Sequence, residues 1–185
     1  MLRAVGLTFE AVPSDVDEAA LRANWRAETP NISPNSVALG LARAKAEEVS
    51  RRYPDAVVIG GDQVLALGTE TVSKAQSIAE ARTTLLKLRG CEHQLHSAVA
   101  LAAGGHAEWT ASDTAALTMR AFSDAFLDTY LVTAGDALTT SAGAYRIEEL
   151  GLQLFERVEG DHFTILGLPL LALLAELRHR GVLPV

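Results

Sequence analysis

The fold is decided by the stretch AVVIGGDQV, residues Ala56–Val64. Its apolar run is rich in β-branched residues, which is typical of a strand buried on both faces. The glycine pair that follows allows a tight turn or a close approach of the backbone to a ligand. Asp62 would then stand at the carboxyl end of a buried strand, where open α/β sheets place their ligand crevices. An ordinary strand-end turn that contains an aspartate stays open as the structural alternative.

The composition excludes several classes of protein. A chain of 185 residues with 49% hydrophobic residues has the makings of one sizeable core, so disorder is excluded. The net charge of −7 argues against a surface for a nucleic-acid polymer, although a few lysines in a cleft would suffice for a small phosphate ligand. The most apolar run, residues 165–174, is too short to span a bilayer, so no membrane partner is expected. The single cysteine, Cys91, excludes an intramolecular disulfide and favours a cytoplasmic location.

Serine residues mark the expected starts of several helices. Ser33 precedes Pro34 and an apolar face with helical spacing, which predicts an N-cap and a first helical residue. Ser77 begins a capping-box pattern ahead of a buried stripe within Ile78–Leu88. Ser123 is expected to cap another helix. Helical and strand signals alternate along the chain, which predicts a single α/β domain over residues 1–185.

Further strands are expected to flank the buried strand within Ala56–Val64. Residues 7–12 and 152–158 have apolar patterns typical of strands. Residues 93–102 and 107–118 flank the turn at Gly104 and Gly105, which predicts a hairpin. A hairpin beside a buried strand of the α/β type favours a mixed sheet.

Two groups of charged residues are candidates for chemistry. Asp15, Asp17 and Glu18 form an acidic knot that is compatible with a metal or magnesium–phosphate site, because hard cations take carboxylate oxygens. A solvated turn beside a helix start is the alternative. Lys45 projects between Leu41 and Val49, on the apolar side of the second helix. A lysine whose stem covers apolar neighbours is the alternative there.

Several stretches together resemble the Maf family of nucleoside triphosphate pyrophosphatases, in the order and spacing of that family and over nearly the whole chain. They are Pro13–Glu18, Leu41–Ala46, Gly60–Val64, Leu88–Gly90 with His93, Ser141–Tyr145 and Gly167–Pro169. The resemblance implies a two-lobed α/β fold related to that of the inosine triphosphatases, with a nucleotide cleft between the lobes. It also implies cleavage between the α- and β-phosphates of a nucleoside triphosphate, a divalent metal cation (magnesium or manganese) and a homodimer.

The resemblance also assigns roles to individual residues. Asp62 matches the proposed general base, which activates the attacking water and also contacts metal. Glu18 matches an acidic residue that shares this metal. Lys45 and Lys74 match lysines that neutralise triphosphate charge, although Lys74 lies in Ser-Lys-Ala where the family often has Gly-Lys-Pro. The transition state spreads negative charge over the nonbridging phosphate oxygens. Positioned cations and the metal that neutralise this charge therefore supply most of the catalysis.

Substrate preference is a second implication of the resemblance. Gln63 and Glu148 stand where the branch that prefers dTTP and UTP has threonine and glutamine, and both resemble the branch that prefers 7-methyl-GTP. A carboxylate suits this base, because it accepts hydrogen bonds from guanine N1–H and the 2-amino group and favours a cationic ring. Two observations keep the dTTP/UTP preference open: Glu148 has the alternative of a surface acid, and the pair Ala144-Tyr145 resembles the other branch.

One part of the family pattern is missing. Its members begin with a strand and a Ser-x-Ser-x-x-Arg loop around the triphosphate, whereas this sequence starts in the helix that should follow. We therefore expect an N-terminally incomplete domain, which is either a misassigned or truncated start or a natural remnant with damaged catalysis. An exposed sheet edge, and lower stability or association with other molecules, should follow. A catalytically weak interaction protein linked to cell division is the alternative function.

Overall fold

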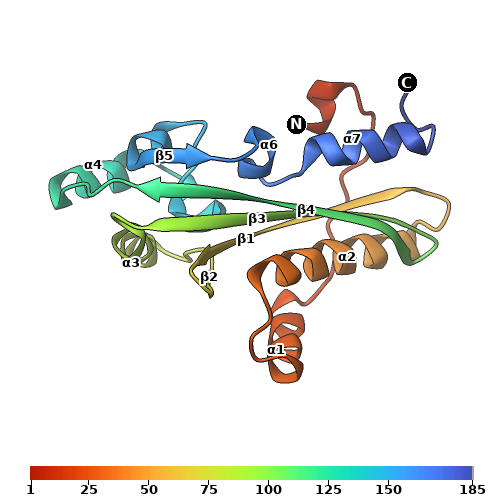
Figure 1. Cartoon of the computed structure of the whole chain (residues 1–185), viewed down its shortest axis with the longest axis horizontal. Coiled ribbons are helices and arrows are strands. Elements are labelled where there is room, and N and C mark those ends of the chain that lie inside the picture. Colours follow the sequence, from red (N-terminus) through yellow and green to blue (C-terminus); the bar gives the residue numbers. More distant parts are fainter. Residues whose placement is uncertain (185) are drawn as a thin grey trace.

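A computed structural model describes residues 1–184 of the chain (Figure 1). The elements follow one another as η1 (Leu2–Val5), α1 (Glu18–Glu28), α2 (Pro34–Arg52), β1 (Val58–Leu67), β2 (Glu70–Val72), α3 (Ile78–Leu88), β3 (Glu92–Ala103), β4 (His106–Met119), α4 (Asp124–Thr133), α5 (Ala137–Thr140), η2 (Ala142–Ala144), η3 (Leu150–Leu154), β5 (Phe155–Glu159), α6 (His162–Ile165) and α7 (Leu170–His179). Over this range, no helix is long and apolar enough to cross a membrane.

The five strands form one sheet in the order β2-β1-β3-β4-β5, and all of its neighbouring pairs are antiparallel. The expectation of a mixed sheet is therefore wrong. Turns at Gly68 and at Gly104-Gly105, all with positive φ, reverse the chain and close the hairpins β1–β2 and β3–β4. Strand β2 runs antiparallel to β1. The connection through α3 then crosses to the other side of β1, where β3 runs in the same direction as β2 and therefore antiparallel to β1.

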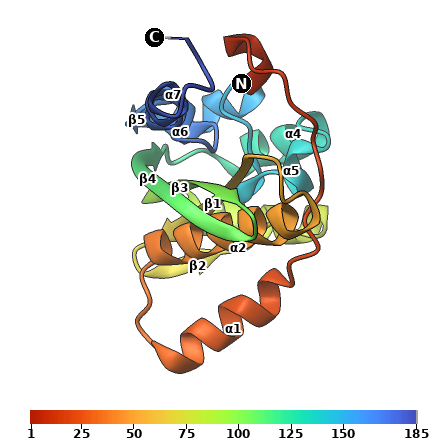
Figure 2. The ribbon, with the colours of Figure 1, turned by 90° about the vertical axis from the view of Figure 1, so that its right-hand side faces the viewer.

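Helices cover both faces of one end of the sheet, with α2 on one side and α7 on the other (Figures 1 and 2). The alternation of β3 explains this arrangement, because successive side chains of a strand point to opposite faces. Ala98 and Ala100 pack in the cluster of α2, whereas Val99 and Leu101 pack in the cluster of α7. This end of the molecule is a three-layer lobe.

The other end of the sheet belongs to a second lobe with its own core. Leu85 of α3, Leu95 of β3, Leu117 of β4 and Tyr130 of α4 are fully or almost fully buried in one apolar cluster. The long strands β3 and β4 run through both lobes (Figure 1). The expected two-lobed α/β architecture is present, joined by a continuous sheet.

The N-terminal segment crosses the molecule beside β1 without forming a strand. Leu7 packs in the cluster of α7, and further along the Pro13 carbonyl oxygen accepts a hydrogen bond from Arg52 of α2 at 2.7 Å. The strand expected over residues 7–12 is therefore wrong. A cavity of about 560 Å³ is lined by residues of this segment and of β1, and their backbones do not pair. In the described chain, β1 has no strand partner at this edge before Leu65.

Candidate active site

A cleft of about 1320 Å³ opens beside the free edge of β1 and is lined by residues from both lobes. All six residues singled out by the sequence contribute to its walls. They are Glu18, Lys45, Asp62, Gln63, Lys74 and Glu148. The structure therefore brings together side chains that are up to 130 positions apart in the sequence.

A close contact between α2 and β1 positions Lys45 and Asp62, which line the cleft. A Cβ atom on Gly60 would lie 2.5 Å from the Ala42 carbonyl oxygen and 2.7 Å from the Ala46 amide nitrogen. Glycine is therefore required so that the strand can pack against the helix. Asp62 lies in the middle of β1, not at its carboxyl end as expected, and faces Lys45 of α2 across this contact.

The Lys45 ammonium is the centre of a short ion-pair cluster. Its Nζ atom lies 2.7 Å from Asp62 Oδ1 and 2.7 Å from Glu18 Oε1. Glu18 is the first residue of α1, which Asp17 caps by accepting a hydrogen bond from the Ala20 amide at 2.9 Å. Of the acidic knot, Glu18 alone reaches the cluster, whereas Asp17 serves the helix start and Asp15 pairs with Arg52 outside the cleft.

The environments of these groups act differently on their pKa values. Burial raises the pKa of the Asp62 carboxyl above its ordinary 3.8; the Glu18 charge adds to this effect, and the hydrogen bond from Lys45 opposes it. Burial also raises the pKa of Glu18, but Lys45, Arg22 and Lys74 outweigh it and hold the value below the ordinary 4.5. Burial lowers the pKa of Lys45, yet its two carboxylate partners raise it overall, so the ammonium stays charged at neutral pH.

One oxygen of Asp62 accepts no hydrogen bond from the described residues. The side chain is only 8% exposed, yet within residues 1–184 its Oδ2 atom has no hydrogen-bond partner. A buried acceptor without a partner is costly and indicates a place for a water, an ion or a substrate group. Those residues contain no cluster of three or more metal-ligating side chains. A pair of carboxylates does fit magnesium, which commonly uses one or two carboxylates together with substrate phosphates.

Sequence reasoning missed Arg22, which stands on α1 above this cluster. Its guanidinium lies 3.8 Å from Asp62 Oδ2 and 3.7 Å from Glu18 Oε2. The signal was present, because Glu18 and Arg22 are four residues apart and so share one face of a helix. One turn further, Arg26 also lines the cleft and donates a hydrogen bond to the Thr71 hydroxyl at 2.7 Å.

The Gln63 side chain makes its hydrogen bonds on the opposite face of the sheet from Asp62. Its Nε2 atom donates to Ser97 Oγ at 3.0 Å and to the carbonyl oxygens of Thr164 and Ile165 at 3.1 Å each. These acceptors fix the orientation of the amide and tie β1 to α6. Gln63 also lines the cleft, and among the described residues no hydrogen bond uses its Oε1 atom.

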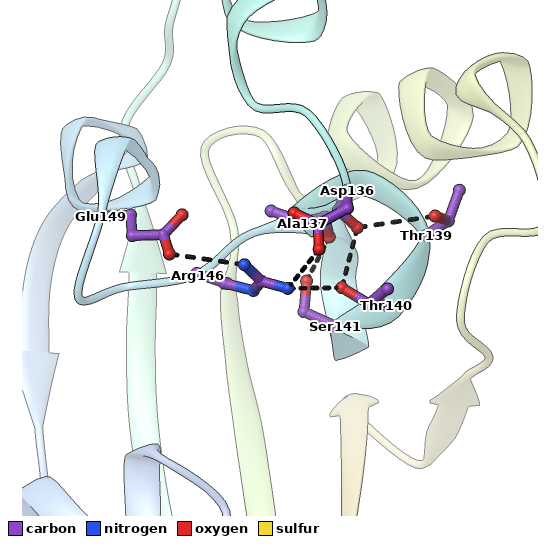
Figure 3. A network of polar contacts seen from close by, with 7 residues as sticks. All are labelled: Asp136, Ala137, Thr139, Thr140, Ser141, Arg146 and Glu149. Carbon is purple, nitrogen blue, oxygen red and sulfur yellow. Dashed lines mark hydrogen bonds and ion pairs between the residues drawn. The ribbon is translucent and has the colours of Figure 1, made fainter.

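Lys74 and Glu148 lie at exposed positions on the rim of the cleft, and among the described residues neither forms an ion pair with the cluster. The loop of Glu148 is held by Arg146, which donates to Asp136 Oδ2 at 3.0 Å and to Thr140 Oγ1 at 2.9 Å and pairs with Glu149 at 3.4 Å (Figure 3). These contacts connect the loop to α5 and its preceding turn. They give the Glu148 segment a defined position although the residue itself is exposed.

Buried aromatic groups anchor the same loop from beneath. The Tyr145 hydroxyl lies 2.7 Å from His93 Nε2, and the Tyr130 hydroxyl donates to the Ala144 carbonyl oxygen at 3.1 Å. Gly143 has φ +80°, and a Cβ there would lie 2.6 Å from Leu65 Cδ1. Ala144 also has a positive φ of 62°, which is uncommon for a residue with a side chain. The surrounding contacts therefore impose this conformation.

Comparisons with known proteins agree with this architecture. The model of the family described as Maf-like protein matches residues 1–180. A "Nucleoside triphosphate pyrophosphatase" of Maricaulis maris is 50% identical over 99% of this chain and 91% of its own length. A "7-methyl-GTP pyrophosphatase" of Mesorhizobium japonicum is 49% identical over the same shares, and a "Nucleoside triphosphate pyrophosphatase" of Caulobacter vibrioides is 48% identical over all of this chain and 92% of its own. The chain therefore belongs to the Maf family.

Proposed function

We propose that the protein hydrolyses nucleoside triphosphates between the α- and β-phosphates, releasing a nucleoside monophosphate and pyrophosphate. Whole-length relatives that carry the name nucleoside triphosphate pyrophosphatase support this reaction. The observation that carries the proposal is the Asp62 carboxylate, which is buried beside a cleft with cationic walls and has one oxygen that accepts no hydrogen bond among the described residues.

The cleft carries enough positive charge for a triphosphate. Arg22, Arg26, Lys45, Lys74 and Arg146 all line it. When a triphosphate binds beside Arg22 and Lys74, these side chains would take the place of the cations that accompany it in solution. Charge-assisted hydrogen bonds from a guanidinium would also orient the chain of phosphates for in-line attack.

The residues of the cluster support a direct hydrolytic step. A water held at Asp62 Oδ2 would attack the α-phosphorus and give its proton to the carboxylate. A bond forms from the water oxygen to the α-phosphorus, and the bond to the bridging oxygen breaks, so that pyrophosphate leaves with that electron pair. Burial favours this role because it raises the pKa of Asp62 and so makes the carboxylate a better proton acceptor.

Glu18 and Asp62 would hold the divalent cation, which when bound neutralises charge on the triphosphate and on the leaving pyrophosphate. Two carboxylates leave room for phosphate oxygens as further ligands, as magnesium and manganese require. Glu18 is suited to this because its pKa is held low by Lys45, Arg22 and Lys74 and it is ionised at neutral pH.

Pyrophosphate release from a panel of canonical and 7-methylated nucleoside triphosphates tests the activity. We expect turnover with magnesium or manganese, and a loss of about 10² to 10⁴ in kcat for Asp62→Asn if the carboxylate is the general base. Asp128→Asn, at a side chain that is 63% exposed on α4, is the matched control and should keep full activity. Silence of the wild-type protein on every nucleotide would favour the interaction protein linked to cell division.

For the base we propose 7-methyl-GTP, with dTTP or UTP as the competing preference. A relative named 7-methyl-GTP pyrophosphatase and the carboxylate of Glu148 on the cleft rim support it. Glu148→Gln should lower kcat/KM for 7-methyl-GTP about tenfold and leave dTTP unaffected, because a charged acceptor for the guanine edge is lost. Glu156→Gln, on exposed β5, is the control. Equal losses on both nucleotides would show that Glu148 does not read the base.

The proposal extends to the state and place of the protein. Nucleoside triphosphates as substrates and a single cysteine support a cytoplasmic location. The homodimer rests on the family resemblance. Light scattering of the purified protein decides this point, since a homodimer has twice the 19.7 kDa mass of one chain.

A further inference from the structure

We propose that Lys45 occupies the cation position of the site before substrate arrives, so that the protein binds the divalent metal together with the triphosphate rather than ahead of it. The inference rests on the proposed function for its second half, the arrival of a metal–nucleotide complex. Its first half concerns only the free protein and the side chains that the structure places there.

Geometry is the first argument. The Lys45 ammonium lies 2.7 Å from Glu18 Oε1 and 2.7 Å from Asp62 Oδ1, between the same two carboxylates that would hold a metal. A divalent cation bridging these groups would have to displace the ammonium or share their oxygens with it. The second oxygen of Asp62, Oδ2, is buried and has no hydrogen-bond partner within the described range, and its nearest cation is the Arg22 guanidinium at 3.8 Å.

Charge is the second argument. Glu18 and Asp62 supply two negative charges, and Lys45 and Arg22 balance them with two positive ones. Lys74 adds a further positive charge that acts on Glu18. The free cluster therefore has no excess negative charge to attract a cation, and an added metal ion would be repelled by the ammonium that already holds its ligands.

Arrival of a triphosphate changes this balance. Its negative oxygens offer Lys45 and Arg22 new partners, and each ammonium or guanidinium that turns to phosphate frees a carboxylate oxygen. Glu18 and Asp62 can then serve a metal that the nucleotide brings with it. The lysine would thus act twice: it neutralises the carboxylates in the free protein and the phosphates in the complex.

Manganese titration without nucleotide tests the first half directly. The signal of free Mn²⁺ in electron paramagnetic resonance reports binding without any turnover. We expect weak binding by the wild-type protein and binding at least about tenfold tighter by Lys45→Met, because one of the two competing charges is gone and the two oxygens that Lys45 bound are free. Lys45→Arg keeps the charge and should bind no more tightly than wild type.

Two controls test whether the tighter manganese binding occurs at Glu18 and Asp62. Arg43→Met removes a charge from the same helix at a side chain that is 62% exposed and should match the wild type. Adding Asp62→Asn to Lys45→Met should abolish the tighter binding. If Lys45→Met lacks the thermal transition of the wild type, Lys45→Gln provides the same loss of charge with a polar end.

The proposal would be overturned if the folded Lys45→Met or Lys45→Gln variant bound manganese no more tightly than the wild type. It would also be overturned if the tighter binding persisted after Asp62→Asn was added. The result is independent of the proposed function. Turnover by the wild type without a gain in the variant removes only this inference, whereas a gain without turnover removes only the function.

Discussion

Arg22 stands beside both carboxylates of the site but uses none of its donors on them. Its nearest carboxylate oxygens are 3.7 and 3.8 Å away, and the described residues give it no hydrogen bond. In contrast, the neighbouring Arg26 is already bonded to Thr71. A guanidinium with free donors in a triphosphate cleft is well placed to bind phosphate oxygens in pairs.

We therefore expect Arg22→Ala to raise KM for the triphosphate about tenfold with a smaller effect on kcat, because charge-assisted hydrogen bonds to the substrate are lost. Steady-state kinetics of pyrophosphate release measure both constants. Arg43→Ala, on the exposed side of α2, is the control. An unchanged KM in Arg22→Ala would mean that this arginine serves only the carboxylates.

For single residues, the sequence predicted positions that depend on neighbours within one helix, but not contacts between distant segments. Helical periodicity placed Lys45 on the apolar side of α2, but neither the periodicity nor the family resemblance predicted its hydrogen bond with Asp62, 17 positions away. Asp17 follows its local pattern as a helix cap. Arg22 escaped notice because the sequence around it gave a weak helix signal, and its target Asp62 lies on a distant strand.

At the scale of elements, the packing of α2 on β1 depends on a glycine. A side chain at Gly60 would collide with the backbone of Ala42 and Ala46, whereas a Cβ at Gly61 would meet its nearest atom, Leu168 Cδ1, at an ordinary 3.5 Å. The two adjacent positions therefore differ in steric tolerance although both belong to the same motif. This contact also sets the distance between Lys45 and Asp62.

Gly60→Ala should lower the free energy of unfolding by about 1–3 kcal/mol, the usual cost of overpacking a close contact. Gly61→Ala should cost less, since its new methyl group has room. Urea denaturation followed by circular dichroism compares the two variants with the wild type. Equal losses of stability would contradict the close approach of helix and strand.

Local signals predicted helix starts well. Ser33, Ser77 and Ser123 each accept a hydrogen bond from the backbone at the start of a helix, as expected. Burial was less predictable, because it depends on what packs against the helix. Ile78 was expected in the buried stripe of α3 but is 59% exposed. Residues 7–12 have a strand-like pattern but no backbone partner, so the pattern alone was insufficient.

For the whole molecule, the direction of the strands was the main error. A mixed sheet was expected, but strand direction follows from connections and carries no local signature. The two lobes and the cleft between them came from the resemblance, and the cleft walls agree with it. The edge of β1 that precedes Leu65 has no strand partner among the described residues and runs beside this cleft.

His93 links the core of the second lobe to the loop of the cleft through Tyr145. Burial lowers its pKa to about 4 from the ordinary 6.5. The unfolded chain therefore binds more protons than the folded one between these values. This contribution to stability is fully present above pH 6.5 and is lost as the pH falls towards 4.

His93→Gln should remove roughly 3 kcal/mol of the acid-induced loss of stability, because glutamine does not titrate in this range. Urea unfolding above pH 6.5 and near pH 4 gives the difference for each protein. His106→Gln, at an exposed position, is the matched control and should behave as wild type. The same loss in His93→Gln and wild type would show that His93 is not the responsible group.

The central claim is that water attacks the α-phosphorus beside Asp62, and hydrolysis in ¹⁸O-labelled water tests it most directly. Mass spectrometry of the products after turnover of 7-methyl-GTP locates the label. The account predicts one ¹⁸O atom in the nucleoside monophosphate, none in the pyrophosphate, and very slow formation of both products by Asp62→Asn. Label in the pyrophosphate, or release of orthophosphate in its place, would contradict it.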